Sequence, residues 1–317
     1  MRAALACLLC WLGASPRRSQ AEDAADDTPK TSVNFCDPVQ WDFPIYCPQG
    51  RTHWPADQLH AALPEFASMY ARRPIRKNMW GMNTNHAFSL WYTVRALKPK
   101  YVIESGVHRG QSTWLLRQAA GPEAWIYSLD PKSESNLLYR DYASGRTRYF
   151  MGESFTDLAA VNWTSLIPIE DRTNTLVMLD DHMACTTRVR DLLASGFVHL
   201  WYDDNWKYVE CYSFNAVCSP VPEGIDYVPF YDDMGRIETL ITVQEHVHNV
   251  KYLVENIEVY FEFPPLLDGC SWDPRQSLSN ESELVALGLP SISEDEYYYL
   301  SLHPPYVKLR AAQQCST

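Results

Sequence analysis

The sequence predicts an α/β fold with a mostly parallel β-sheet and helices on both faces of that sheet. Segments of strand character alternate with segments of helical periodicity from about residue 86 to residue 263. The strand segments are apolar on both faces, which is typical of parallel strands buried between two layers of helices. Polar residues follow several of these strands, where a parallel sheet presents its carboxyl ends to a ligand.

The composition indicates a folded domain without a nucleic-acid partner. Hydrophobic residues make up 46% and charged residues 21% of the 317 residues, a balance that leaves enough apolar surface for a core. The formal net charge is −12, and no cluster of Lys and Arg stands out. Because a phosphate-binding surface requires clustered cations, we expect no binding to nucleic acid.

Residues 1–21 are typical of a cleavable secretory signal. An apolar run from Ala3 to Ala14 follows Arg2, and small residues stand at Ser19 and Ala21. This run is shorter than the about 18 residues of a transmembrane helix, so we expect membrane contact only if the segment stays uncleaved. The sequence therefore predicts a protein of the ER or Golgi lumen, or a secreted protein.

Cysteines and glycosylation triplets agree with this location. Cys7 and Cys10 lie in the signal segment, and the remaining seven of the nine cysteines are an odd number that leaves one unpaired. The sequence contains the triplets Asn162-Trp-Thr and Asn280-Glu-Ser, which are acceptors for N-linked glycans in the secretory pathway. The expected disulfides are Cys36–Cys47, Cys211–Cys218 and Cys270–Cys315.

We divide the chain into four parts. The signal segment covers 1–21, and residues 22–75 form an acidic, then Pro- and aromatic-rich segment with a helix near 56–71. The α/β domain covers 76–263, and 264–317 is expected to be an irregular extension that packs on it. Strands are predicted over 100–105, 124–130, 148–153, 175–180, 197–204 and 257–263, and helices over 86–98, 110–120, 186–195 and 236–255.

Polar residues follow five consecutive predicted strands. A single acid at such a position is explained about equally well as a helix N-cap, but five in succession at one sheet edge indicate a binding site. The residues are Glu104 with Gly106 and Gly110, Asp130, Gly152-Glu153-Ser154, Asp180-Asp181-His182, and Asp203-Asp204-Asn205.

The segment E-S-G-V-H-R-G-Q-S at 104–112, followed by Asp130, resembles the cofactor-binding part of class I S-adenosylmethionine (SAM)-dependent methyltransferases, which have a Rossmann-like sheet. The resemblance implies that the two glycines let the backbone approach the methionine part of SAM, and that Asp130 binds the ribose hydroxyls. The turn lacks the G-x-G-x-x-G spacing of nicotinamide sites. The implied cofactor contacts are Glu104, Gly106, Gly110, Ser112, Asp130 and Ser154.

The segments M-L-D-D-H at 178–182 and Y-D-D-N-W at 202–206 resemble the metal-binding strand ends of cation-dependent O-methyltransferases. Those enzymes include the catechol and caffeoyl-coenzyme A type, and the cephalosporin-hydroxylase-like and macrolide-sugar methyltransferase groups look similar. The resemblance spans about residues 80–210 and implies Mg²⁺, which would orient two substrate oxygens and lower the pKa of one hydroxyl. The implied ligands are Asp180, Asp204 and Asn205, with Asp181 and Asp203 as alternates because doubled acids leave the register open.

The sequence departs from the catechol type at the catalytic base. The related enzymes carry a Lys shortly after the first metal-binding Asp, where this chain has His182-Met183-Ala184-Cys185. We predict His182 as the base or as an adenine contact, with Lys207 and His86 as further candidates. A structural role for a lone His is at least as common. Aromatic residues of the fifth strand end either wall an acceptor pocket or only pack: Trp201, Tyr202, Trp206, Tyr208 and Tyr212.

These features predict a SAM-dependent, Mg²⁺-assisted O-methyltransferase acting on a hydroxylated small molecule or glycan in the secretory pathway. The missing Lys leaves open a hydroxylase-like oxidoreductase on the same fold, and the clustered Asp residues leave open a luminal glycosyltransferase. A non-catalytic secreted binding protein is the fourth alternative, because fold alone does not establish function. The identity of the acceptor and the oligomeric state do not follow from the sequence.

Overall fold

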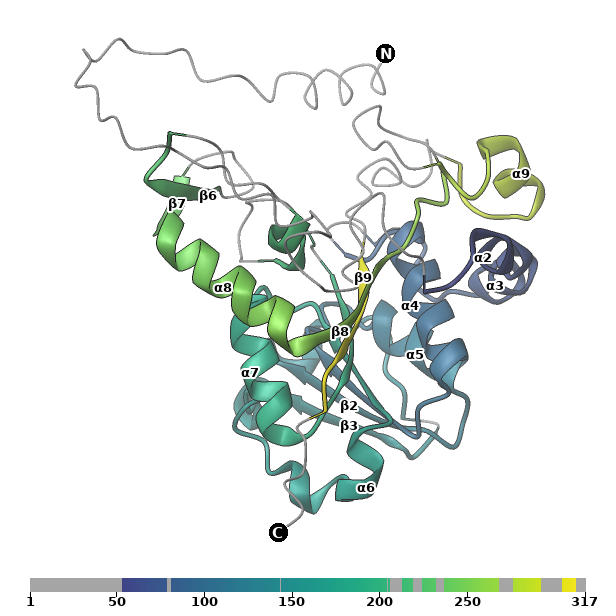
Figure 1. The fold of residues 1–317 in the computed structure, drawn as a ribbon. Coiled ribbons are helices and arrows are strands. Elements are labelled where there is room, and N and C mark those ends of the chain that lie inside the picture. The colour runs from purple at the N-terminus through teal and green to yellow at the C-terminus, as the bar shows by residue number, and fades with distance from the viewer. Residues whose placement is uncertain are drawn as a thin grey trace.

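The computed structural model describes residues 53–78, 81–142, 144–203, 205, 213–218, 224–231, 237–267, 276–291 and 304–311. Figure 1 shows a central sheet between two layers of helices. The predicted signal segment lies outside the described residues, as does at least one cysteine of each expected disulfide. Within the described part of the chain, no helix has the length and apolar character needed to cross a membrane.

The central sheet has seven strands in the order β3-β2-β1-β4-β5-β9-β8. The first five strands pair in parallel, and β9 runs antiparallel to both of its neighbours, β5 and β8. This order, with an antiparallel strand inserted next to the edge, is that of the class I methyltransferase fold, so the predicted fold class is confirmed. The strands are β1 (Tyr101–Ser105), β2 (Trp125–Asp130), β3 (Thr147–Met151), β4 (Thr175–Leu179), β5 (His199–Tyr202), β8 (Ile257–Glu262) and β9 (Pro305–Leu309).

The helices divide between the two faces of the sheet, with α4 and α5 on one side and α7 and α8 on the other (Figure 1). Short 3₁₀ segments occur at Glu134–Asn136, Gly152–Ser154, Trp163–Ser165 and Phe214–Cys218. The helices are α2 (Ala56–Ala61), α3 (Leu63–Tyr70), α4 (Thr84–Leu97), α5 (Gln111–Ala120), α6 (Ile169–Arg172), α7 (Cys185–Ser195), α8 (Val243–Asn256) and α9 (Glu281–Ala286).

The two hydrophobic cores follow from the alternation of side chains along the strands. Met178 of β4 and Trp201 of β5 pack with α4 and α5, whereas their neighbours Leu179 and Leu200 pack with α7 and α8. Successive residues of a strand point to opposite faces of the sheet, so each buried parallel strand contributes side chains to both cores. This alternation also assigns a face to the residues that follow each strand.

Helix ends lie where the sequence provides capping residues. The Asn83 side chain accepts a hydrogen bond from the His86 backbone N–H at 3.0 Å and begins α4. Lys98, with φ of 51°, ends the same helix directly before Pro99. Gly196, with φ of 80°, ends α7 as the sequence predicts.

Two segments differ from the sequence prediction. Residues 237–242, expected to begin a helix, form strand β7 (Ile237–Thr242), which pairs with β6 (Tyr227–Tyr231) in a separate two-stranded sheet. The β-branched Ile and Thr residues of this stretch favour an extended chain, and α8 begins only after Thr242 caps it. Residues 305–309, expected in an irregular extension, form β9 between β5 and β8.

Candidate functional site

The carboxyl ends of four neighbouring strands bring the predicted polar residues to one edge of the sheet. The Asp180 backbone N–H donates to the Ser105 carbonyl, and the Asp203 N–H to the Leu179 carbonyl, each at 2.8 Å. The residues after β4 and β5 therefore continue the backbone hydrogen-bond ladder of the parallel sheet. By strand alternation, four acids take the face covered by α4 and α5: Glu104, Asp130, Asp180 and Asp203.

The turn between β1 and α5 needs glycine at both predicted positions. Gly106 has φ of 95° and Gly110 has φ of 92°. A Cβ atom on Gly106 would lie 1.9 Å from the Asp180 carbonyl oxygen, and one on Gly110 would lie 2.3 Å from the Tyr139 carbonyl oxygen. The turn is therefore packed backbone to backbone against the end of β4 and the segment after β2.

Asp130 holds the shape of this turn. Its Oδ2 accepts hydrogen bonds from the backbone N–H groups of Val107 (2.9 Å) and His108 (3.0 Å), and Oδ1 accepts from Lys132 N–H at 2.7 Å. These three bonds use most of the about four acceptor positions of a carboxylate. The ribose contact implied by the resemblance stays a prediction, and the structure adds a role in ordering the turn.

Glu104 is fully buried at the end of β1. Its Oε2 accepts hydrogen bonds from the hydroxyls of Thr113 (2.8 Å) and Ser128 (2.5 Å). Burial raises the pKa of Glu104 to about 7, against the opposing effect of hydroxyl hydrogen bonds that include Ser112. Its Oε1 is buried and has no hydrogen-bond partner among the described residues.

Gln111 is a second buried polar side chain at the same turn, and sequence reasoning missed it. It is the first residue of α5 and is 3% exposed. Neither its amide nitrogen nor its amide oxygen has a partner within the described part of the chain. Buried polar atoms are rarely left without partners, so the turn fits a polar ligand that would satisfy both Glu104 and Gln111.

The two adjacent acids after β4, Asp180 and Asp181, lie on different faces of the sheet. Asp181 Oδ2 accepts from the Ser105 hydroxyl at 2.5 Å and from Arg188 Nε at 2.9 Å. Arg188 is buried in α7 and also binds Asp157 and Asp191. Asp181 is therefore the acid that Arg188 neutralises, whereas Asp180 takes the opposite face of the sheet, the one covered by α4 and α5.

Asp203, the first of the two adjacent acids after β5, forms a buried pair with His86. Asp203 Oδ1 lies 2.5 Å from His86 Nδ1, and the side chain of each residue is 5% exposed. Asn205 is also buried; its amide nitrogen donates to Tyr260 Oη at 3.0 Å and its Oδ1 accepts from Asn215 N–H at 2.8 Å. Asp203 and Asn205 thus contribute to packing around β5, and their role as metal ligands stays untested.

The described residues contain no group of three or more His, Cys, Asp or Glu side chains placed to hold a metal ion. Asp204 and Lys207, a predicted ligand and a predicted catalytic residue, lie outside the described residues. Ser154, a predicted cofactor contact, is exposed and instead caps a 3₁₀ turn, where its hydroxyl donates to the Met151 carbonyl at 2.9 Å. The buried Ser112 lies beside Glu104.

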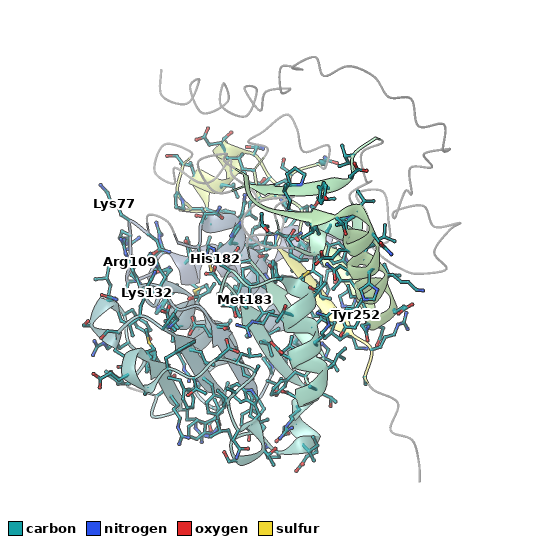
Figure 2. The ribbon with its side chains drawn as sticks, turned by 90° about the vertical axis from the view of Figure 1, so that its left-hand side faces the viewer. Lys77, Arg109, Lys132, His182, Met183 and Tyr252 are labelled. Carbon is teal, nitrogen blue, oxygen red and sulfur yellow. The ribbon has the colours of Figure 1, made fainter. Side chains whose placement is uncertain are left out.

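His182 follows Asp181 at this edge of the sheet. Its side chain is exposed, and its φ of 55° is unusual for a residue other than glycine. Figure 2 shows His182 and Met183 on the flank of the molecule that also carries Arg109 and Lys132. His182 is therefore accessible to a substrate, whereas His86 is buried and held by Asp203.

Comparisons with known proteins concern the fold. No protein-family model and no curated protein matches the chain. Among solved structures, cofactor-bound Rv0187 from MTB is 16% identical over 48% of this chain and 66% of its own, with a TM-score of 0.31. A methyltransferase from Geobacter sulfurreducens is 17% identical over 48% of this chain and 75% of its own, with a TM-score of 0.28. The SAH-bound Podospora anserina methyltransferase PaMTH1 is 17% identical over 49% of this chain and 64% of its own, with a TM-score of 0.31. The match thus spans about two thirds of the first of these proteins.

Replacing Gly106 with alanine is expected to destabilise the fold more than the same change at Gly145. Both glycines have positive φ, but a Cβ on Gly145 meets no atom within 4 Å, whereas one on Gly106 meets the Asp180 carbonyl. We expect a loss of about 1–2 kcal/mol for Gly145→Ala and at least about 3 kcal/mol for Gly106→Ala, measured by chemical denaturation. Equal losses would show that the turn does not pack against β4 as described.

Proposed function

We propose that the chain is a SAM-dependent methyltransferase that acts on a hydroxyl group of a small molecule or glycan. The observation that carries this proposal is the pair of buried polar side chains, Glu104 and Gln111, whose amide and Oε1 atoms have no partner among the described residues. In the class I methyltransferase fold, the methionine part of SAM lies at this turn. A carboxylate suits an ammonium group and an amide suits a carboxylate, so the two side chains match an amino-acid moiety.

SAM, when bound, supplies a methyl group on a positively charged sulfur. The part of the protein is mainly to place the reactants, and alignment of this kind is worth about 7–11 kcal/mol of barrier in favourable cases. Asp130 serves this purpose, because it fixes the backbone N–H groups of Val107 and His108 and so the path of the turn. Gly106 and Gly110 keep side chains out of the same space.

Two histidines are candidates for removing the proton of the acceptor hydroxyl. His182 is exposed and follows Asp181 at the carboxyl end of β4. His86 is held by Asp203, and a carboxylate partner fixes the orientation of the ring. Accessibility supports His182 as the residue that contacts the acceptor, with the His86–Asp203 pair as a link between α4 and the end of β5.

Titration of the purified protein with SAM tests the proposed function. We expect saturable binding that Gln111→Leu weakens about tenfold or more, since the loss of one hydrogen bond to a charged group costs about 1.5–3 kcal/mol. The same change removes a buried polar group without a partner, so the melting temperature should stay the same or rise. Absence of SAM binding to the unaltered protein would refute the proposal.

We also propose that a divalent cation such as Mg²⁺ assists the reaction, with Asp180 and Asp204 as its principal ligands. The support is the resemblance of the strand ends M-L-D-D-H and Y-D-D-N-W to those of cation-dependent O-methyltransferases, together with the position of Asp180 at the carboxyl end of β4, beside the Gly106 turn. Oxygen ligands of this kind suit a hard cation. The cation would orient the acceptor oxygens and lower the pKa of the reacting hydroxyl.

Mutation of Asp180 and mutation of Asp181 should have different effects. Asp180→Asn is expected to weaken Mn²⁺ binding about tenfold or more, because it removes a ligand charge. Asp181→Asn should lower the free energy of unfolding by about 1–3 kcal/mol by removing one acid from Arg188, and it should leave Mn²⁺ affinity nearly unchanged. Titration calorimetry and denaturation measure both; unchanged Mn²⁺ binding in Asp180→Asn contradicts the ligand assignment.

Finally, we propose that the protein works in the secretory pathway. The structure is compatible with the two glycosylation triplets, since Asn162 and Asn280 are both exposed. Expression in a eukaryotic secretory system should give a product whose mass falls on treatment with an N-glycosidase. The Asn162→Gln variant should carry one glycan fewer, so its mass should fall by a smaller amount. A product without glycans and with residues 1–21 retained would argue against this location.

A further inference from the structure

A run of cations precedes α4. Four of the six residues at 72–77 are cations, although the chain has a net charge of −12: Arg72, Arg73, Arg76 and Lys77. Arg73 donates to the Tyr70 carbonyl at 3.3 Å and Arg76 to the Ala71 carbonyl at 2.6 Å, so both are held by neutral groups. None of the four forms an ion pair with a described residue. The overall charge conceals this run, which the sequence-based expectation of no cationic cluster therefore overlooked.

The run lies along the edge of the sheet that carries the turn between β1 and α5. Tyr70, shortly before the run, contacts Trp114 of α5, with ring centroids 6.4 Å apart. After the run, Asn83 begins α4, and His86 of that helix pairs with Asp203 at the end of β5. The chain at 71–82 therefore passes from the first turn of α5 to the end of β5.

Two further cations flank the turn itself. Arg109 is part of the turn, and Lys132 follows β2. Asp130 joins the two segments, since its Oδ2 accepts from His108 N–H at 3.0 Å and its Oδ1 from Lys132 N–H at 2.7 Å. Figure 2 shows Lys77, Arg109 and Lys132 along one flank of the molecule. We call these three cations the basic rim.

Neighbouring acids do not neutralise the basic rim. Lys77 and Lys132 are exposed, Arg109 is half-buried, and none of the three forms an ion pair with a described residue. Glu134 and Glu153 follow β2 and β3 at the same edge, but neither pairs with the rim. Within the described part of the chain, the rim therefore keeps its positive charge for a ligand.

The exposure of the basic rim decides which kind of anion it can hold. One ion pair at an exposed site changes affinity by only about 1.4- to fivefold, because water screens the attraction. An anion with one charge is therefore hardly distinguished from a neutral molecule. An anion with several charges along its length meets several cations and multiplies these factors, so the rim favours an extended, multiply charged ligand.

We propose that the methyl acceptor is an acidic glycan whose carboxylate or sulfate groups bind the basic rim. This inference rests on the proposed function and specifies the charge of the acceptor. A sugar chain carries both free hydroxyls and regularly spaced charges, and glycans are made in the secretory pathway in which we place the protein. The planar guanidinium of Arg109 suits a two-point contact with an oxyanion, whereas Lys77 and Lys132 contribute point charges.

Calorimetric titration of the protein saturated with S-adenosylhomocysteine (SAH) tests the inference. The probes are three hexasaccharides: hexagalacturonate with carboxylates, a heparin-derived hexasaccharide that also carries sulfates, and neutral maltohexaose. We expect both acidic probes to bind, and the neutral probe to bind at least about tenfold more weakly. A rise in NaCl from about 50 to about 200 mM should weaken the acidic probes about tenfold or more, because binding at three cations releases counterions. The tighter acidic probe indicates the preferred anionic group.

Variants assign the binding to the basic rim. Neutralising all three cations should weaken the acidic probes about tenfold or more while SAH still binds: Lys77→Gln, Arg109→Gln and Lys132→Gln. Because Arg109 belongs to the turn, a second variant with only Lys77→Gln and Lys132→Gln leaves the turn unaltered and should weaken these probes about fivefold. The matched control removes three exposed cations at the end of α4 and before β1 and β3, and it should weaken them less than about twofold: Arg95→Gln, Lys100→Gln and Arg146→Gln.

The outcomes separate this inference from the proposed function. Failure of both acidic probes to bind, equal binding of maltohexaose, or equal losses in the rim and control variants would overturn the inference and leave the proposed function standing. Tighter binding of hexathymidylate than of either acidic hexasaccharide would overturn a glycan as the acceptor. Failure of SAH to bind the unaltered protein would overturn the proposed function, and this inference with it.

Discussion

The alternation of side chains along the parallel strands is the constraint on which the site depends. Each strand is buried on both faces, so every residue after a strand end is committed to one of two helical layers. The acids that follow β4 and β5 therefore meet partners on different faces of the sheet. Asp181 turns toward α7 and finds Arg188, while Asp203 turns toward α4 and finds His86. A one-residue shift in either strand would move each acid to the opposite face, so the strand register fixes which partner each acid meets.

The buried pairs on either side of the sheet also explain why the edge is well defined. A buried charge is costly unless it is paired, and removal of one partner commonly costs several kcal/mol. Arg188 joins the end of β4 to α7 and to Asp157, and the His86–Asp203 pair joins α4 to the end of β5. These contacts hold the strand ends in place without using Glu104 or Gln111. The polar groups of the turn can therefore remain available for a ligand while the scaffold around them is satisfied.

Much of this architecture could be predicted from sequence because it depends on local patterns. The apolar segments that alternate with helical segments predicted the positions of β1 to β5. Gly196 and Pro99 predicted helix ends that the structure confirms. The doubled acids were less informative, since their partners Arg188 and His86 come from helices whose contacts a linear pattern does not show. Gln111 was missed for a related reason: its distinguishing property is the lack of a partner, which exists only in three dimensions. Strand β9 was missed because it begins at Pro305, directly after Pro304, and paired prolines are typical of irregular chain.

The position of β9 has a consequence for how the chain acquires its structure. About forty residues separate the end of β8 at Glu262 from the start of β9 at Pro305, yet β9 lies between β5 and β8 in the finished sheet. While the chain leaves the ribosome, the edges of β5 and β8 have no partner until residues 305–309 have emerged. Exposed strand edges attract other chains, so the interval before β9 is inserted is the period in which the nascent protein most needs a chaperone.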